Sequence, residues 1–147
     1  MKKEFESKKG ALQWVIGTRG DVSYRGSRHA SASKAPTNRD AVELDKTIDF
    51  VKSTSHKRRF FPKLEPPLAV HTYCDSSYAN LPDGRTQGGY MVTVEGATLG
   101  KACTVEVHSG PLKRVATTPF DGETIQTCDA LDATLDVCAR LSELENG

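Results

Sequence analysis

The chain has 147 residues, of which 37% are hydrophobic and 27% charged, a composition typical of one globular domain or of one small domain with an extension. No run of roughly 18 apolar residues occurs, so we expect no membrane span. The charged start MKKEFESKKG lacks the apolar core of a signal peptide. The expected location is therefore the cytoplasm, the nucleus or both. The net charge of +1 excludes a uniformly basic nucleic-acid-binding surface.

Charge is unevenly distributed along the chain. Residues 1–63 hold most of the Lys and Arg, including Lys57, Arg58 and Arg59, whereas the last part of the chain is acidic. The basic half could lie against phosphate, and a solvated surface is the other interpretation. The four cysteines form no CxxC pair, so we expect small buried or half-buried thiols rather than zinc ligands or disulfides.

The first half of the chain is predicted to be helical, with residues 1–10 as a charged tail and residues 11–54 as the helical region. A short apolar face is formed by Leu12, Val15 and Ile16. A second helix has Thr37 and Asn38 as candidate caps. Its apolar residues recur at helical spacing, at Ala41, Leu44, Ile48 and Val51.

Residues 55–67 mix charges with prolines and are predicted to be a linker. Three strands are expected after it, at 68–75, 90–94 and 102–108, because β-branched and aromatic residues gather there. The short connections between them favour an antiparallel meander.

A long helix is predicted to begin at Thr118, which can cap it. Pro119 suits the first helical position, and Asp121 stands at the capping-box offset. We expect the apolar stripe of this helix to face the sheet; it comprises Phe120, Cys128, Leu131, Leu135, Cys138 and Leu141. The predicted fold class is α+β, with a three-stranded antiparallel sheet and one long helix after a small helical region.

Two acids are candidates for chemistry. Asp75 ends an apolar strand, where a carboxylate is costly unless it is paired or bound to a cation; the alternative is that it merely begins a turn. Glu123 lies at the border of the apolar stripe and is directed at the sheet; the alternative is a side chain that extends past the border into solvent. The acids further along the helix, Asp129, Asp132 and Asp136, project away from the stripe.

Residues 74–96, CDSSYANLPDGRTQGGYMVTVEG, resemble the ribonuclease H opening of copia-type retrotransposon Pol polyproteins. Residues 107–124, VHSGPLKRVATTPFDGET, resemble the next block of that family, whose helix acid falls on Glu123. Residues 11–31, ALQWVIGTRGDVSYRGSRHAS, resemble the end of its reverse transcriptase. The blocks follow in the family's order over about residues 11–145. The resemblance implies a reverse transcriptase remnant at 11–54 and a truncated ribonuclease H-like domain at 68–147.

The resemblance also implies a metal-dependent nuclease ancestry. In that fold, carboxylates of the first strand and first helix, here Asp75 and Glu123, bind Mg²⁺ or Mn²⁺ and the metals hydrolyse RNA in RNA–DNA hybrids. A third carboxylate would come from a strand after the helix, and this chain stops at Gly147 without one. The polymerase motif Tyr-x-Asp-Asp is also missing. We therefore expect weak metal binding, and the enzymatic status of the chain stays open.

Three roles remain: an enzyme completed by a carboxylate from elsewhere, a non-catalytic nucleic-acid-binding module, and an inert relic reading frame. The binding module would contact phosphates through Lys57, Arg58, Arg59, Lys113 and Arg114. Relic status is favoured by departures from the family pattern, at Gly20, Gly26, His29, Val107 and Gly122. The expected partners are an RNA–DNA hybrid, the rest of the polyprotein and a second copy bound to the unpaired edge of strand 68–75, with no membrane.

Overall fold

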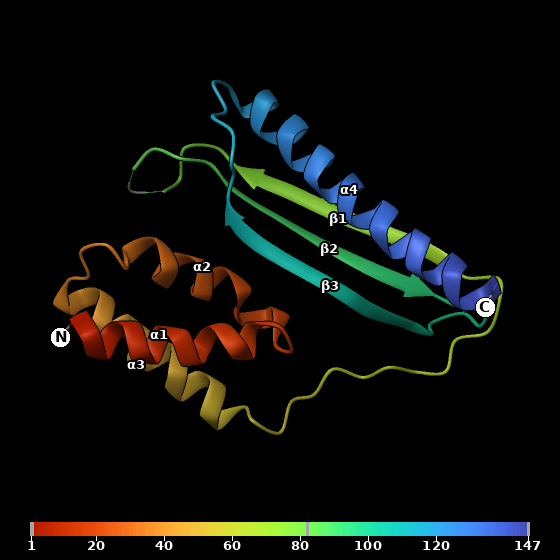
Figure 1. Ribbon diagram of the computed structural model, residues 1–147, viewed down its shortest axis with the longest axis horizontal. Coiled ribbons are helices and arrows are strands. Elements are labelled where there is room, and N and C mark those ends of the chain that lie inside the picture. Colours follow the sequence, from red (N-terminus) through yellow and green to blue (C-terminus); the bar gives the residue numbers. More distant parts are fainter. Residues whose placement is uncertain (1, 82, 147) are drawn as a thin grey trace. The chain divides into compact units, whose positions relative to one another are not determined.

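A computed structural model describes residues 2–81 and 83–146, except for the side chains of residues 145 and 146. The chain divides into two compact units between Arg59 and Phe60, inside the segment predicted to be a linker. The first unit is helical and the second contains the sheet (Figure 1). Among the described residues, none of the helices combines the length and the apolar character that crossing a membrane requires.

The first unit consists of α1 (Lys2–Ile16), α2 (Ser23–Ala32) and α3 (Asn38–Ser53), with a short 3-10 turn between the first two helices. Its core is formed by Phe5, Leu12, Val22 and Leu44. Residues 2–10, expected to be a charged tail of the helical first half, belong to α1. Phe5 and Leu12 stand two helical turns apart and therefore share one face, which holds this charged stretch against the core.

The amphipathic pattern of α3 is confirmed. Leu44 is fully buried, and the other apolar residues of its face, Ala41, Ile48 and Val51, pack around it. Thr37 caps the helix: its Oγ1 accepts a 3.2 Å hydrogen bond from the Asp40 N–H, and Asp40 Oδ2 accepts one of 2.8 Å from the Thr37 N–H. This reciprocal capping box satisfies donors that a helix start leaves free.

Gly26 and His29 have structural roles in α2. A Cβ at Gly26 would stand 2.0 Å from Ile16 Cδ1, so the missing side chain lets α1 and α2 approach. His29 is buried, with Nε2 3.0 Å from Thr47 Oγ1 and its ring edge-to-face with Phe5. Burial lowers the pKa of His29, which favours a neutral core histidine.

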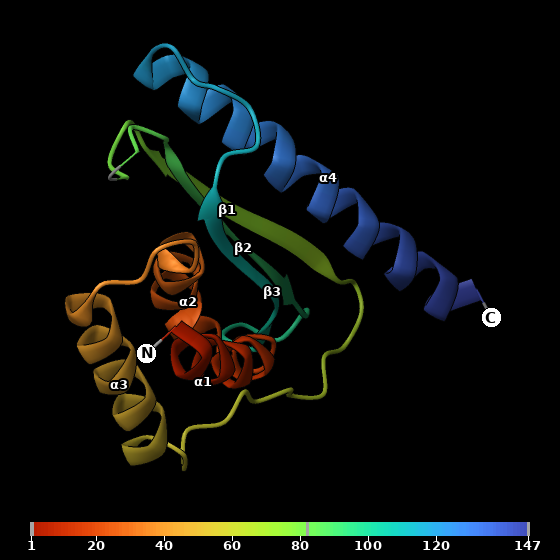
Figure 2. The same cartoon turned by 60° about the vertical axis from the view of Figure 1, so that its left-hand side comes forward.

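The second unit contains an antiparallel sheet in the order β1-β2-β3, which confirms the predicted meander. Its strands are β1 (Ala69–Ser77), β2 (Gln87–Glu95) and β3 (Ala102–Pro111). Tyr73 pairs with Met91, and Met91 pairs with Val107. The long helix α4 (Pro119–Asn146) runs along β1 and packs on β1 and, less, on β2 (Figure 2). The unit is α+β, with an open three-stranded sheet and a long C-terminal helix.

The predicted sheet-facing side of α4 is wrong. The buried positions are instead Gly122, Gln126 and Ala130, whereas Phe120, Leu131 and Leu135 are 78%, 55% and 58% exposed. Helix-facing residues of β2 such as Val92 are fully buried beneath it. Small residues on α4 permit this close approach, and the bulkier stripe is turned outward.

The start of α4 agrees with its predicted cap. Thr118 Oγ1 accepts a hydrogen bond from the Asp121 N–H at 3.1 Å, and Asp121 Oδ2 accepts one from the Thr118 N–H at 3.0 Å. All four cysteines are free thiols, and only Cys103 is partly buried. The expectation of buried or half-buried thiols is therefore wrong for Cys74, Cys128 and Cys138, which are exposed.

Candidate functional site

The first turn of α4 meets the end of β1 through a polar contact. Ser76 Oγ donates a 3.0 Å hydrogen bond to Glu123 Oε1. The approach is close because Gly122 is buried there and has no side chain; a Cβ would stand 3.0 Å from Ser76 Oγ. Glu123 is thus directed at the sheet, as its border position on the helix predicts.

Asp75 does not share this contact. Successive side chains of a strand point to opposite faces of its sheet, and Thr72, Cys74 and Ser76 all contact α4. Asp75 therefore lies on the face turned away from the helix, where its Oδ1 accepts a 2.9 Å hydrogen bond from the Ser76 N–H. The structure brings Glu123 to the neighbour of Asp75 rather than to Asp75 itself.

Asp75 and Glu123 are the expected cation ligands. Within residues 2–81 and 83–146, no group of three or more His, Cys, Asp or Glu side chains is arranged to hold a metal ion. Asp75 lies on the face of β1 turned away from α4, whereas Glu123 approaches the other face from α4. Metal binding by this pair stays a prediction that the geometry does not favour.

The predicted phosphate-binding residues belong to different units. Lys57, Arg58 and Arg59 lie at the end of the first unit, where Lys57 and Arg58 are exposed and Arg59 is partly buried. Lys113 and Arg114 are exposed in the segment that joins β3 to α4. Each pair of exposed cations is adjacent in the chain and can contact phosphate within its own unit.

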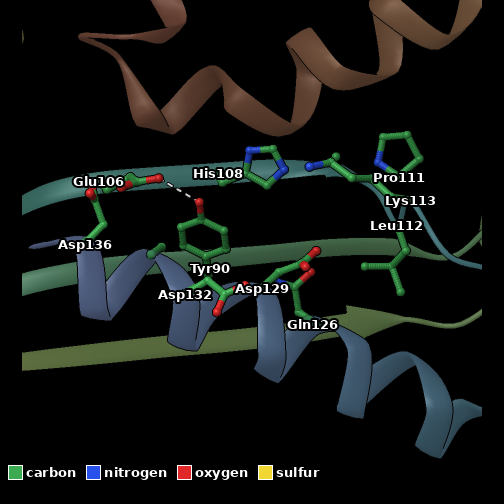
Figure 3. Close-up of a pocket in the computed structure, with 12 residues that line it drawn as sticks. Tyr90, Glu106, His108, Pro111, Leu112, Lys113, Gln126, Asp129, Asp132 and Asp136 are labelled. Carbon is green, nitrogen blue, oxygen red and sulfur yellow. Dashed lines mark hydrogen bonds between the residues drawn. The ribbon is translucent and has the colours of Figure 1, made fainter.

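Sequence reasoning missed a pocket of about 290 Å³ between α4 and the strands β2 and β3 (Figure 3). Tyr90 donates a 2.6 Å hydrogen bond to Glu106 Oε1, and its ring stacks on His108 at a centroid distance of 5.3 Å. Burial, followed by the bond to Glu106, raises the pKa of Tyr90 well above the ordinary value of 10.0. The phenol therefore remains a donor at neutral pH.

The α4 side of the pocket is acidic. Asp129, Asp132 and Asp136 line it, and Asp136 is paired with Arg140 at 2.8 Å. The Gln126 side chain also lines it, and Nε2 of this buried residue has no hydrogen-bond partner within the described part of the chain. Side chains alternate between the two faces of the sheet along β2 and β3. This alternation was the sequence signal for the pocket, because it places Tyr90, Glu106 and His108 together on the helix-facing side.

Comparison of the chain with protein-family models, curated proteins and solved structures finds no match.

Proposed function

We propose that this chain is a fragment or relic of a copia-type retrotransposon Pol polyprotein, spanning the end of the reverse transcriptase and the first part of a ribonuclease H-like domain. The contact of Glu123 with Ser76 supports the proposal most directly, because it brings the first-turn acid of α4 beside the end of β1, one residue from Asp75. An antiparallel meander followed by a long helix also agrees with the order of elements in that domain.

The ancestral role in this proposal is metal-dependent hydrolysis of RNA in RNA–DNA hybrids during retrotransposition, as part of the whole polyprotein. Mg²⁺ or Mn²⁺ would supply the hydrolytic chemistry. Asp75 and Glu123 lie on different faces of β1, and no three-ligand group occurs among the described residues. We therefore derive no hydrolytic step for this chain and expect it to be inactive alone.

Incubation of the purified chain with a labelled RNA–DNA hybrid and Mg²⁺ tests this expectation. Wild type should cleave no more than Asp75→Asn or Glu123→Gln. Cleavage by wild type that both variants abolish would contradict it and restore the enzyme hypothesis. The ancestry is tested by the nucleotides that follow the codon of Gly147: we expect a strand bearing Asp and then a helix, and an unrelated sequence there counts against the proposal.

The second candidate function is non-catalytic nucleic-acid binding. Exposed Lys113 and Arg114 lie in the segment that leads directly to Glu123, so a phosphate backbone there would meet two adjacent cations. Binding through them should weaken steeply with salt, and Lys113→Ala/Arg114→Ala should reduce the slope by about 2. Lys2→Ala/Lys3→Ala is the matched control. A flat salt response, measured by fluorescence anisotropy with a hybrid, contradicts this candidate and leaves the inert relic.

A further inference from the structure

The outer edge of β1 and one flank of α4 form a joint surface in the second unit. β1 is an edge strand, because it pairs only with β2 among the described residues. Two threonines of α4 contact this strand. The hydroxyls of Thr134 and Thr72 are 2.5 Å apart, and Thr127 Oγ1 is 3.8 Å from Cys74 Sγ. Thr127 and Thr134 separate the sheet-facing side of α4 from its exposed apolar stripe. The stripe therefore lies on the side of α4 that extends beyond β1.

Between Phe120 and Ser142, this flank of α4 carries no charge. At about 100° per residue it comprises Phe120, Thr124, Thr127, Cys128, Leu131, Leu135, Cys138 and Ser142. The acids Asp129, Asp132 and Asp136 lie on the opposite flank, where they line the pocket. An uncharged, largely apolar flank can be removed from water without the cost of burying ions, which distinguishes it from an ordinary solvated helix surface.

The midpoint of the β1 edge lies beside the midpoint of the helix flank. Tyr73 is the middle residue of β1, which runs from Ala69 to Ser77. The α4 residues that contact its two neighbours are Thr134 and Thr127, and Leu131 lies between them. Leu131 is also the middle of the uncharged flank. A two-fold axis passing beside Tyr73 would therefore pass beside Leu131 as well.

We propose that this surface binds a second copy of the chain, with the two β1 strands antiparallel and centred on Tyr73 and the two α4 flanks packed around Leu131. In that register His71 stands directly opposite the partner's Asp75, and Asp75 opposite the partner's His71. An imidazole that faces a carboxylate across an antiparallel pair can donate a hydrogen bond to it, and such facing pairs stabilise the sheet. His71 already has one carboxylate neighbour, with Nε2 3.1 Å from Glu95 Oε2, and the second copy supplies another.

The spacing of strands and helices is compatible with this arrangement. Paired strands are about 5 Å apart, and α4 contacts both β1 and β2. The two helices would then be separated by about 10 Å, within the range of directly packed helices. Pairing would also remove the unpaired backbone groups of the β1 edge. The facing His71 and Asp75 side chains and a shared centre for both contact surfaces favour a second copy over an unrelated partner.

Engineered cross-linking gives the sharpest test, in a full-length chain whose four cysteines are replaced by Ser. Tyr73→Cys should form a disulfide-linked dimer under mild oxidation, because directly paired residues have Cα atoms within the disulfide range. Met91→Cys is the matched control, since Met91 pairs with Tyr73 one strand further in. It should stay uncross-linked. Equal cross-linking of both variants, or none of Tyr73→Cys, would overturn the proposal.

Sedimentation of the unmodified chain provides a second measurement. Wild type should have twice the mass of the 16.0 kDa chain, and Leu131→Lys should be monomeric. The control Leu144→Lys makes the same change at a residue of α4 that is 81% exposed and off the flank, and it should remain dimeric. A monomeric wild type, or dimers unaffected by Leu131→Lys, rejects the idea. Hybrid cleavage plays no part here, so failure would leave the proposed ancestry unaffected.

Discussion

The hydroxyl of Tyr90 lies 2.6 Å from Glu106 Oε1, where it donates a hydrogen bond from β2 to β3. Tyr90 pairs directly with His108, and Glu106 pairs with Val92, so the bond runs diagonally across the two strands. Both side chains are only partly buried. The bond satisfies a carboxylate on the helix-facing side of the sheet, where acids of α4 also gather, and it should therefore contribute to stability.

Tyr90→Phe removes this donor while preserving the ring that stacks on His108. A hydrogen bond to a charged group contributes about 1.5–3 kcal/mol, and partial exposure places the expected loss near the lower value. Urea unfolding monitored by circular dichroism measures it. The control is Tyr24→Phe, in α2 and 46% exposed, which should change stability by less than about 0.5 kcal/mol. Equal losses in both variants would show that the bond contributes nothing specific.

The raised pKa of Tyr90 predicts an alkaline dependence of stability. Burial and Glu106 keep the folded phenol protonated at a pH where the unfolded chain, with a tyrosine pKa of about 10, has lost its proton. The stabilisation is therefore complete below about pH 10 and is lost as pH rises toward the raised pKa. Above about pH 10, the free energy of unfolding should fall more steeply in wild type than in Tyr90→Phe. Parallel slopes in an alkaline series of urea titrations would contradict the assignment.

Loss of the α3 cap should destabilise the first unit. Thr37→Ala removes the acceptor for the Asp40 N–H, at an expected cost of about 1 kcal/mol. It also removes the Thr37 hydroxyl, whose hydrogen bond is the main cause of the lowered pKa of the Asp40 carboxyl. Thr37→Ser keeps the hydroxyl and should unfold close to wild type. If the serine and alanine variants unfold at the same urea concentration, the cap does not contribute as described.

The contact between β2 and α4 predicts a coupled pair of substitutions. A Cβ at Gly88 would stand 1.8 Å from Gln126 Oε1 and 2.6 Å from Leu112 Cδ2, so Gly88→Ala should cost about 1–3 kcal/mol through overpacking. Gln126→Ala removes the nearer obstacle together with an Nε2 that has no hydrogen-bond partner among the described residues.

The double variant Gly88→Ala/Gln126→Ala should lose less unfolding free energy than the two single variants lose together, as expected for residues in direct contact. Gly89→Ala is the control for coupling to Gln126, because the nearest neighbour of its Cβ would be His108 O at 3.3 Å. Its effect should add to that of Gln126→Ala. Strict additivity in a urea-unfolding double-mutant cycle would argue against this contact.

Much of the local structure followed from short-range patterns. The Thr37 and Thr118 caps, the Ala41–Val51 face of α3 and the antiparallel meander depend on neighbours a few residues apart, and such interactions are visible in one dimension. Residues 1–10 were expected to be a charged tail of the helical first half. Only the core that Phe5 shares with Leu12 shows what holds this stretch in place.

By itself, the sequence determined the elements, their order and the position of Glu123 at the border of its helix. Tertiary structure decided which sides of those elements face one another. α4 packs through Gly122, Gln126 and Ala130, of which Gly122 and Ala130 are small enough to permit its close approach to the sheet, and the leucine stripe is left outside. Pairing of the strands set the face of every β1 side chain, and since one residue changes that face, it placed Ser76 rather than Asp75 against the helix acid.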